Sequence, residues 1–313
     1  MDGRSVVVLV NCVGGGELAV VRDILVTAHH IPTVLIERGQ LESLSVTLDL
    51  DTGLLDVHGV LVRPAVVWIR HGAAGALLAH HGPAGGLTPL DADSWLRLFN
   101  RMAESAVVGL PGAAPLGTAQ LGAAKRLGVR VPNTVVTTDV RAAAGRLAAS
   151  RIIVKLPDFR LFEPDRRRWA GCAPMVLDRS SVTGAEVPGG RPVVVQEFVP
   201  HVRELRVYYL NGAIAAFEVR KSAPSSQWTA SGDAGVTQVD CPPSVIDAVR
   251  LLGTAWKLRY GAFDLLVVPG GEPVFLELNA DGDWLWYERK ARWHGISFMA
   301  AVMVHELYVR SIS

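Results

Sequence analysis

The sequence predicts a mixed α/β protein in which a small α/β lobe comes first and antiparallel hairpins mixed with helices follow. Near the N-terminus, an apolar run at 5–10, a helical periodicity at 17–29 and a second apolar run at 31–36 have the order strand, helix, strand. Toward the C-terminus, two pairs of apolar runs are joined by Asn211–Gly212 and by Pro269–Glu272, and both connections are typical of hairpins.

Length, composition and charge restrict the class of protein. The 313 residues, half of them apolar, suit two or three compact lobes. Lys and Arg total 31 against 30 Asp and Glu, so there is no global basic field and we expect no nucleic-acid partner. The three cysteines (Cys12, Cys172 and Cys241) lack metal-ligand spacing and favour a reducing cytoplasm. No membrane span is expected, and a homodimer is an open alternative to a monomer.

Three ranges organise the chain: an N-terminal α/β domain at 1–110, a central subdomain at 111–195 and a C-terminal subdomain at 196–313. The expected strands are 5–10, 31–36, 44–50, 54–58, 60–62, 66–69, 152–156, 192–199, 204–210, 213–220, 262–268 and 274–279. The expected helices are 17–29, 93–107 with Asp91 or Asp93 as its cap, 118–127 ending at Gly128, 139–150, 242–258 and 297–309. Beyond residue 70 no further parallel strand–helix–strand unit is predicted.

A carboxylate cluster follows from the geometry of the last hairpin. If Val268 faces Pro273 across the loop, Asp264 lies directly opposite Glu277, with their Cβ atoms roughly 5 Å apart. Asn279 shares the face of Glu277, because side chains alternate along a strand. Two adjacent carboxylates repel unless a cation lies between them, and oxygen-only ligands favour magnesium, with manganese as the alternative. The alternative interpretation is a solvated strand face that carries ordinary surface acids.

This hairpin also resembles a known family. Phe-Asp-Leu at 263–265 and Phe-Leu-Glu-Leu-Asn at 275–279 are similar to the metal-binding signature of the ATP-grasp superfamily, in particular its microviridin-type (graspetide) peptide ligases, which are related to ribosomal-protein glutamate ligases. Further matching segments are Val-Trp-Ile-Arg at 67–70, Leu-Gly-Val-Arg-Val-Pro-Asn-Thr at 127–134, Val-Lys at 154–155, Gln-Glu-Phe-Val-Pro at 196–200, Glu-Leu-Arg-Val at 204–207, Tyr-Gly-Ala-Phe-Asp at 260–264 and Asn-Ala-Asp-Gly-Asp-Trp-Leu-Trp at 279–286. The resemblance implies an ATP-grasp fold with a Rossmann-like N-terminal lobe.

The resemblance also implies roles for residues of a nucleotide site that binds ATP and magnesium. Lys155 would neutralise the α- and β-phosphates, and Glu204 would accept from the ribose hydroxyls. The adenine would contact the hinge formed by Gln196, Glu197, Phe198 and Val199. Each of these residues has an ordinary structural alternative, such as a surface lysine or a plain core strand.

Two arginines are the catalytic candidates that the resemblance implies. Arg206 would meet the γ-phosphate and then an acyl phosphate, since its planar guanidinium suits phosphate oxygens. Arg220, on the other strand of the same hairpin, is a second candidate. The implied reaction is two-step: a carboxylate attacks the γ-phosphate, and an amine or hydroxyl then displaces phosphate to form an amide or ester.

The sequence departs from the family pattern at three places. The family lysine expected near Gly117 or Thr118 is missing, and Gln227-Trp228-Thr229 stands where an acid-Trp-Arg triplet is usual. Ala280 replaces the proline that usually follows Asn279. These changes suggest a different substrate or reduced activity.

Several interpretations of the function stay open at this point. The resemblance favours a ribosomally made precursor peptide as substrate, for which a basic segment at 166–169 would suit an acidic leader. The alternatives are a small-molecule carboxylate–amine ligase and a non-catalytic peptide-binding scaffold. A distant rival is an NAD-dependent oxidoreductase, because Gly14-Gly15-Gly16-Glu17-Leu18-Ala19 fits G-x-G-x-x-A and Glu37 follows at about the expected 20 residues.

Overall fold

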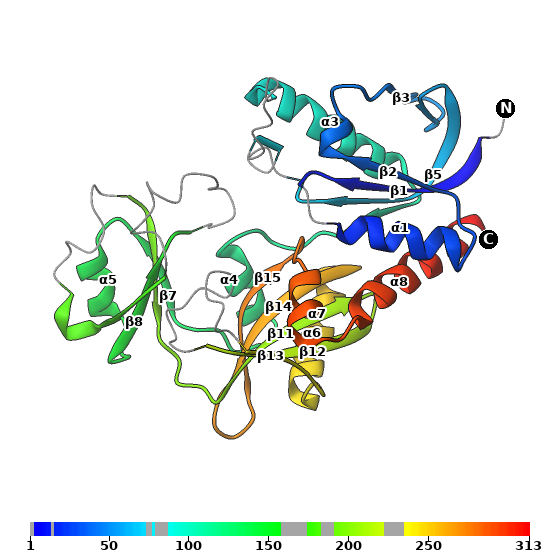
Figure 1. The fold of residues 1–313 in the computed structure, drawn as a ribbon. Coiled ribbons are helices and arrows are strands. Elements are labelled where there is room, and N and C mark those ends of the chain that lie inside the picture. Colours follow the sequence, from blue (N-terminus) through cyan, green and yellow to red (C-terminus); the bar gives the residue numbers. More distant parts are fainter. Residues whose placement is uncertain are drawn as a thin grey trace.

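The computed structural model describes residues 3–13, 16–72, 77–78, 87–157, 174–182, 191–221 and 235–313. These residues form three sheets with helices packed on them, which confirms the mixed α/β prediction (Figure 1). Four features singled out in the sequence lie outside the described residues: Gly14–Gly15, the basic segment 166–169, Cys172 and the stretch 227–229.

The N-terminal lobe is a three-layer α/β unit. Its sheet has the order β2-β1-β5-β4-β3, with β6 paired to β5, and β2, β1, β5 and β6 run parallel. Its strands are β1 (Arg4–Asn11), β2 (Thr33–Glu37), β3 (Val46–Leu48), β4 (Leu55–Val57), β5 (Val60–Arg70) and β6 (Val108–Leu110). Helix α1 (Glu17–Thr27) packs on one face and α3 (Pro89–Ser105) on the other, since alternate β1 residues enter the two core clusters.

Three sequence predictions for this lobe need correction. Strand β5 is continuous, whereas the sequence predicts two strands. Pro64 has no N–H to donate, and a bulge beside it lets β5 continue its pairing with β1. Helix α3 is capped by Thr88, whose hydroxyl accepts from the Asp91 N–H, so Asp91 is the reciprocal partner of the cap. The unit β5–α3–β6 is a further parallel crossover that the three-residue strand β6 made hard to predict.

The central lobe is an antiparallel sheet with one helix on it. Its order is β7-β10-β8-β9, with β7 (Thr134–Thr137), β8 (Arg151–Lys155), β9 (Met175–Asp178) and β10 (Val193–Glu197). Helix α5 (Val140–Arg146) packs on the face that carries Val193 and Val195. Asp139 caps this helix by accepting from the Ala142 N–H, which confirms its predicted start.

The C-terminal sheet carries the predicted metal-binding hairpin. Its order is β13-β12-β11-β14-β15, and all pairs are antiparallel. Its elements are β11 (Arg203–Leu210), β12 (Ala213–Arg220), β13 (Gly235–Val239), α6 (Pro243–Ala255), β14 (Tyr260–Val267), β15 (Pro273–Asn279), α7 (Leu285–Ala291) and α8 (Gly295–Ile312). Asn211 and Gly212 have φ values of 50° and 103°, so the predicted two-residue hairpin turn is confirmed.

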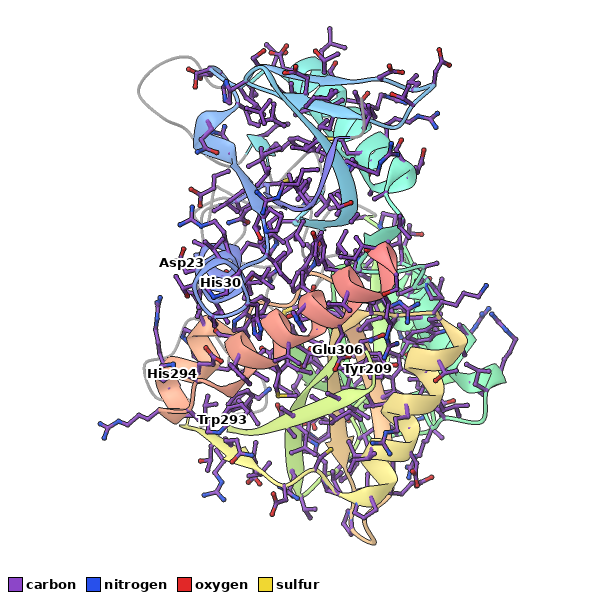
Figure 2. The ribbon with its side chains drawn as sticks, turned by 90° about the vertical axis from the view of Figure 1, so that its right-hand side faces the viewer. Asp23, His30, Tyr209, Trp293, His294 and Glu306 are labelled. Atoms are coloured by element: carbon purple, nitrogen blue, oxygen red, sulfur yellow. The ribbon has the colours of Figure 1, made fainter. Side chains whose placement is uncertain are left out.

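Helix α8 joins the N-terminal lobe to the C-terminal sheet. Figure 2 shows it running between the two lobes, and its buried residues share one apolar cluster with β1, β5 and the 208–217 region. The Tyr308 hydroxyl donates to the Ser5 carbonyl oxygen at 3.1 Å. The two lobes therefore share a continuous core. In the described part of the chain, no helix is long and apolar enough to cross a bilayer.

The elements near residues 110 and 195 show where one sheet ends and the next begins. The last strand of the N-terminal sheet, β6, ends at Leu110. Helix α4 (Ala119–Arg126), which falls within the predicted central range, packs instead in the core of the C-terminal sheet. Strand β10 runs to Glu197, so the central sheet continues past the predicted boundary at 195.

Gln120 of α4 seals the edge of the C-terminal sheet. Its side-chain amide donates to the Leu278 carbonyl oxygen at 3.0 Å and accepts from the Leu278 N–H at 2.8 Å. We expect Gln120→Ala to lower the free energy of unfolding by about 2 to 4 kcal/mol, because it leaves a buried donor and acceptor unpaired. Urea unfolding measures this loss, with the exposed Lys125→Ala on the same helix as control. Equal stability of the two variants would contradict this role.

Candidate active site

The two carboxylates predicted to form a metal site lie opposite each other on β14 and β15. Asp264 pairs with Glu277, and Ala262 pairs with Asn279. The loop register assumed from the sequence is wrong, because Val267 rather than Val268 pairs with Pro273. A bulge just before Leu265 shifts the pairing by one residue and restores the predicted Asp264–Glu277 pair.

Asp264 is a buried carboxylate with one oxygen left unsatisfied. Its side chain is 9% exposed, and its Oδ2 accepts from Arg206 Nη1 at 2.8 Å. Its Oδ1 is buried and has no hydrogen-bond partner among the described residues. Burial, opposed by Arg206 and assisted by the charge of Glu277, raises the pKa of Asp264 to about 7. A buried acceptor of this kind is costly unless it binds a donor or a cation.

The donor set around Asp264 suits a hard divalent cation. Glu277 is exposed beside it, and Asn279 contributes an amide oxygen, Oδ1, which accepts from the Asp281 N–H at 3.1 Å. Within the described ranges, no cluster of three or more His, Cys, Asp or Glu could hold a metal. Among the described residues, the candidate donors on this face are two carboxylates and one amide oxygen, a set that fits magnesium, an ion that keeps several waters.

Arg206 lies at the centre of this face of the sheet. Its side chain is 6% exposed, and its guanidinium carbon lies 5.6 Å from the Tyr208 ring centroid and 5.4 Å from that of Tyr287. Its Nε is buried without a partner among the described residues. The ion pair with Asp264 and this free donor place one guanidinium beside the candidate metal ligands.

The backbone of Gly282 approaches Arg206 closely. A Cβ at this position would lie 2.6 Å from Arg206 Nη2 and 2.4 Å from the Ala262 Cβ. Only a residue without a side chain fits there, so the 279–284 loop can lie against the arginine.

Arg220 does not join this group. It shares a face with Glu218, and Glu218 pairs with Leu205, so Arg220 faces away from Arg206. Its side chain is 78% exposed, and its Nε donates to Glu218 at 3.0 Å.

Two of the predicted nucleotide residues share one face of the central sheet. Lys155 pairs with Val194 and Gln196 pairs with Ile153, which puts both side chains on the face opposite α5. Gln196 is buried, and its Nε2 donates to Thr134 Oγ1 at 2.9 Å.

Glu197 lies on the other face of that sheet. Its carboxylate accepts from the backbone N–H of Asn133 at 2.9 Å and from Asn133 Nδ2 at 3.0 Å. The structure therefore does not bring the Glu197 side chain to the face of Lys155, and its hydrogen bonds with Asn133 give it a structural role just before β7.

The hinge residues Phe198 and Val199 connect the central and C-terminal sheets. The Phe198 N–H donates to the Arg151 carbonyl oxygen at 3.0 Å, and its ring lies 4.2 Å under the Arg151 guanidinium carbon. Val199 is buried, and its carbonyl oxygen accepts from His201 Nδ1 at 2.8 Å.

Glu204 shares the face of Arg206 and has both oxygens engaged. One accepts from His201 Nε2 at 3.2 Å, and the other lies 2.9 Å from Lys221 Nζ. Burial opposes its ionisation, but His201 and Lys221 outweigh burial and lower the pKa of Glu204. The same hydrogen bond raises the pKa of His201 above its ordinary value.

The pair has a defined pH range of stabilisation. The contribution of His201 is complete below its unfolded pKa of about 6.5 and is lost as pH rises through the higher folded pKa. That of Glu204 is present above about 4.3 and is lost as pH falls through the lower folded pKa. We expect Glu204→Gln to lower the pKa of His201 in an NMR titration, with His58 as an unaffected reference. An unchanged His201 pKa would contradict the pairing.

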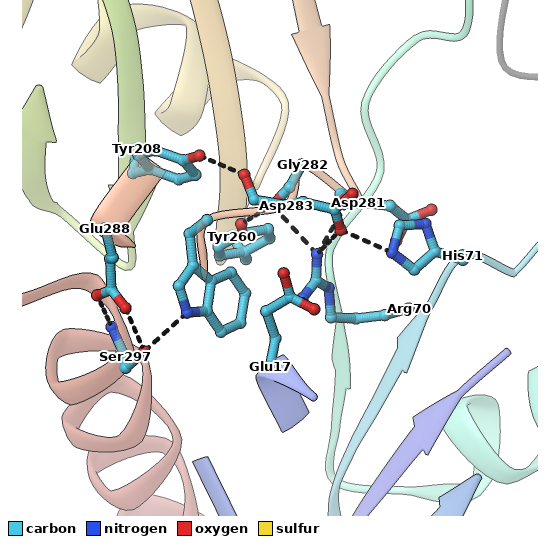
Figure 3. Close-up of polar contacts among 11 residues, drawn as sticks. Glu17, Arg70, His71, Tyr208, Tyr260, Asp281, Gly282, Asp283, Glu288 and Ser297 are labelled. Carbon is cyan, nitrogen blue, oxygen red and sulfur yellow. Dashed lines mark hydrogen bonds and ion pairs between the residues drawn. The ribbon is translucent and has the colours of Figure 1, made fainter. Parts of the chain in front are cut away.

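A polar cluster that the sequence analysis did not predict lies between the N-terminal lobe and the 279–284 loop (Figure 3). Arg70, at the end of β5, donates to the carbonyl oxygens of Asp281 and Gly282 and to the Asp283 carboxylate, at 2.9, 3.1 and 3.1 Å. His71 Nε2 lies 3.0 Å from the same Asp283 oxygen. The signal was available, because the segments 67–70 and 279–286 were both family matches.

The start of α1 disfavours a dinucleotide. Glu17 is the first residue of this helix, its side chain is 7% exposed, and its Oε2 lies 3.7 Å from Arg70 Nη1. A pyrophosphate would need this helix N-terminus, where the buried carboxylate would repel it. The Glu37 side chain accepts from the backbone of Gln40, so it caps the turn at 38–40.

Comparisons with known proteins identify the fold. No family model and no curated protein matches the sequence. Among solved structures, the chain is similar to a RiPP-associated ATP-grasp ligase of Chryseobacterium gregarium, solved with ADP and a leader and core peptide (TM-score 0.71, 18% identity, 97% of each chain). It is also similar to the macrocyclase MdnC of Microcystis aeruginosa, bound to precursor peptide MdnA (TM-score 0.69, 18% identity, 96% of this chain and 99% of that chain).

A third similar structure is that of D-alanyl-alanine synthetase A of Vibrio cholerae. It aligns with a TM-score of 0.57 and 15% identity over 99% of each chain. The chain therefore has the ATP-grasp fold, over nearly its whole length. At these identities the likeness establishes the fold alone.

Proposed function

We propose that this protein is an ADP-forming ligase that uses Mg-ATP to activate a carboxylate and join it to an amine or hydroxyl. The observation that carries the proposal is the face of the C-terminal sheet on which Asp264, Glu277 and Arg206 meet. Its buried, unpartnered Asp264 Oδ1 and Arg206 Nε suit a cation and an anion side by side.

The metal ligands in this proposal are Asp264, Glu277 and Asn279. When bound there, magnesium would neutralise charge on the phosphate oxygens and so assist phosphoryl transfer. Manganese is the alternative ion, since its oxygen-ligand chemistry is similar.

Cationic side chains of two lobes would hold the phosphates. Lys155 and Gln196 share the face of the central sheet opposite α5, and the chain continues from the end of β10 at Glu197 through Phe198 and Val199 to β11, which carries Arg206. Arg206 would stabilise the γ-phosphate as it passes to the substrate carboxylate, giving an acyl phosphate and ADP. An amine or hydroxyl would then displace phosphate, forming the amide or ester bond.

We propose a ribosomally made precursor peptide as the substrate, with side-chain ester or amide crosslinks as the product. Two similar structures contain leader, core or precursor peptides, and that supports a peptide substrate. The likeness to D-alanyl-alanine synthetase supports a small-molecule carboxylate–amine ligase as the second candidate. The missing lysine near Gly117 motivates a third, a peptide-binding scaffold without turnover.

Calorimetric binding of ADP with and without magnesium tests the proposal, with NADH titrated into the same preparation. We expect magnesium to strengthen ADP binding by about tenfold or more, which corresponds to about 1.4 kcal/mol. NADH binding without ADP binding would overturn the proposal in favour of an oxidoreductase. If neither ADP nor NADH binds, a peptide-binding scaffold without turnover would be the better interpretation.

A further inference from the structure

Arg70 reaches out of the N-terminal lobe to the loop that directly follows the metal-binding strand. Strand β15 ends at Asn279, and the loop continues through Asp281, Gly282 and Asp283. Arg70 Nη2 lies within 3.1 Å of an oxygen atom on each of those three residues (Figure 3). One guanidinium from a different lobe therefore spans the loop.

Two tyrosines hold the same loop from the C-terminal sheet. The Tyr260 hydroxyl donates to the Gly282 carbonyl oxygen, and the Tyr208 hydroxyl donates to that of Asp283. Every carbonyl oxygen from 281 to 283 therefore accepts from a side chain, and Asn279 in turn accepts from the Asp281 N–H. This chain of contacts leads from Arg70 to a proposed metal ligand.

The surroundings of Arg70 are unusual for a residue that only joins two lobes. Its side chain is 1% exposed, and its guanidinium carbon lies 4.4 Å from the Trp284 ring centroid. Burying a charge is expensive even with good partners, and apolar residues of similar volume often stabilise such a contact as well. The lobes already share an apolar core, so stability alone is a weak reason for an arginine here.

We infer that Arg70 is a positioning residue that fixes the 281–283 loop and, through it, the orientation of Asn279 toward magnesium. This inference rests on the proposed function. It makes the N-terminal lobe part of the metal site, although Arg70 touches neither metal nor nucleotide. The competing account is a structural clamp, which would support folding without affecting how magnesium and ADP bind together.

The two accounts differ in the coupling between magnesium and ADP, defined as the ratio of ADP affinities with and without the metal. We expect Arg70→Met, which keeps much of the volume and loses all donors, to lower this ratio by about tenfold while magnesium-free ADP affinity stays unchanged. Arg70→Lys should restore part of the ratio, because one ammonium can replace only some of the bonds. Arg63→Met, an exposed change on the same strand, is the matched control.

Tyr260→Phe provides a second variant if Arg70→Met does not fold. It removes only the hydroxyl that binds Gly282, and we expect a smaller fall in the same ratio at nearly unchanged stability. An unchanged ratio in a folded Arg70 variant, or a parallel loss of both affinities, would overturn the inference and leave a structural clamp. A wild-type protein whose ADP binding ignores magnesium would overturn the proposed function, and the inference with it.

Discussion

Glu277→Gln is expected to abolish the magnesium-dependent part of ADP binding while leaving the protein folded. The change keeps the size of the side chain and removes one of the two charges that face each other across β14 and β15. Losing a carboxylate ligand should weaken magnesium binding by about a hundredfold or more, because even mutation of a residue that only hydrogen-bonds to a metal ligand weakens metal binding markedly. Calorimetry with and without magnesium measures the loss.

The same substitution should not destabilise the metal-free protein. Glu277 is exposed and raises the pKa of buried Asp264 by its negative charge, so its removal relieves a repulsion. Glu272→Gln in the loop of the same hairpin is the control, since that exposed carboxylate pairs with Arg130 away from the site. Undiminished magnesium dependence in Glu277→Gln would contradict the metal assignment.

The sequence was informative where local rules decide the structure. The Asn211–Gly212 turn sets the pairing of β11 and β12, which places Arg206 on a known face. The Asp264–Glu277 pair was also predicted, although two deviations of one residue compensated each other. The loop shifts the register at Val267, and a bulge at Leu265 shifts it back, and neither has a sequence signal strong enough to predict.

The sequence could not predict contacts between lobes, or the face of the sheet on which the side chain at the end of a strand lies. Arg70 and Asp283 are more than two hundred positions apart along the chain, and only packing of the two lobes brings them together. Glu197 follows the alternation of β10 onto the α5 face, where Asn133 binds it, while the family resemblance pointed to adenine. Helix α4 likewise packs on the C-terminal sheet, where its apolar residues enter the core and Gln120 binds the edge strand β15.

Arg206→Ala should have the largest effect on stability at the site and a selective effect on turnover. Removing the guanidinium leaves Asp264 buried without its ion-pair partner, which typically costs about 3 to 5 kcal/mol. Urea unfolding measures this cost, and the double variant with Asp264→Asn should lose less than the sum of the single variants, because the two side chains interact.

The effect on turnover separates a phosphate-binding arginine from a merely structural one. If Arg206 stabilises the transferred phosphate, ADP release from Mg-ATP should fall by about a hundredfold, whereas ADP affinity with magnesium should fall much less. Arg220→Ala serves as control, because that cation points to the other face of the sheet and is mostly exposed. Equal losses of turnover and ADP affinity in Arg206→Ala would contradict a role in phosphoryl transfer, since an interaction that acts in the transition state must affect rate more than binding.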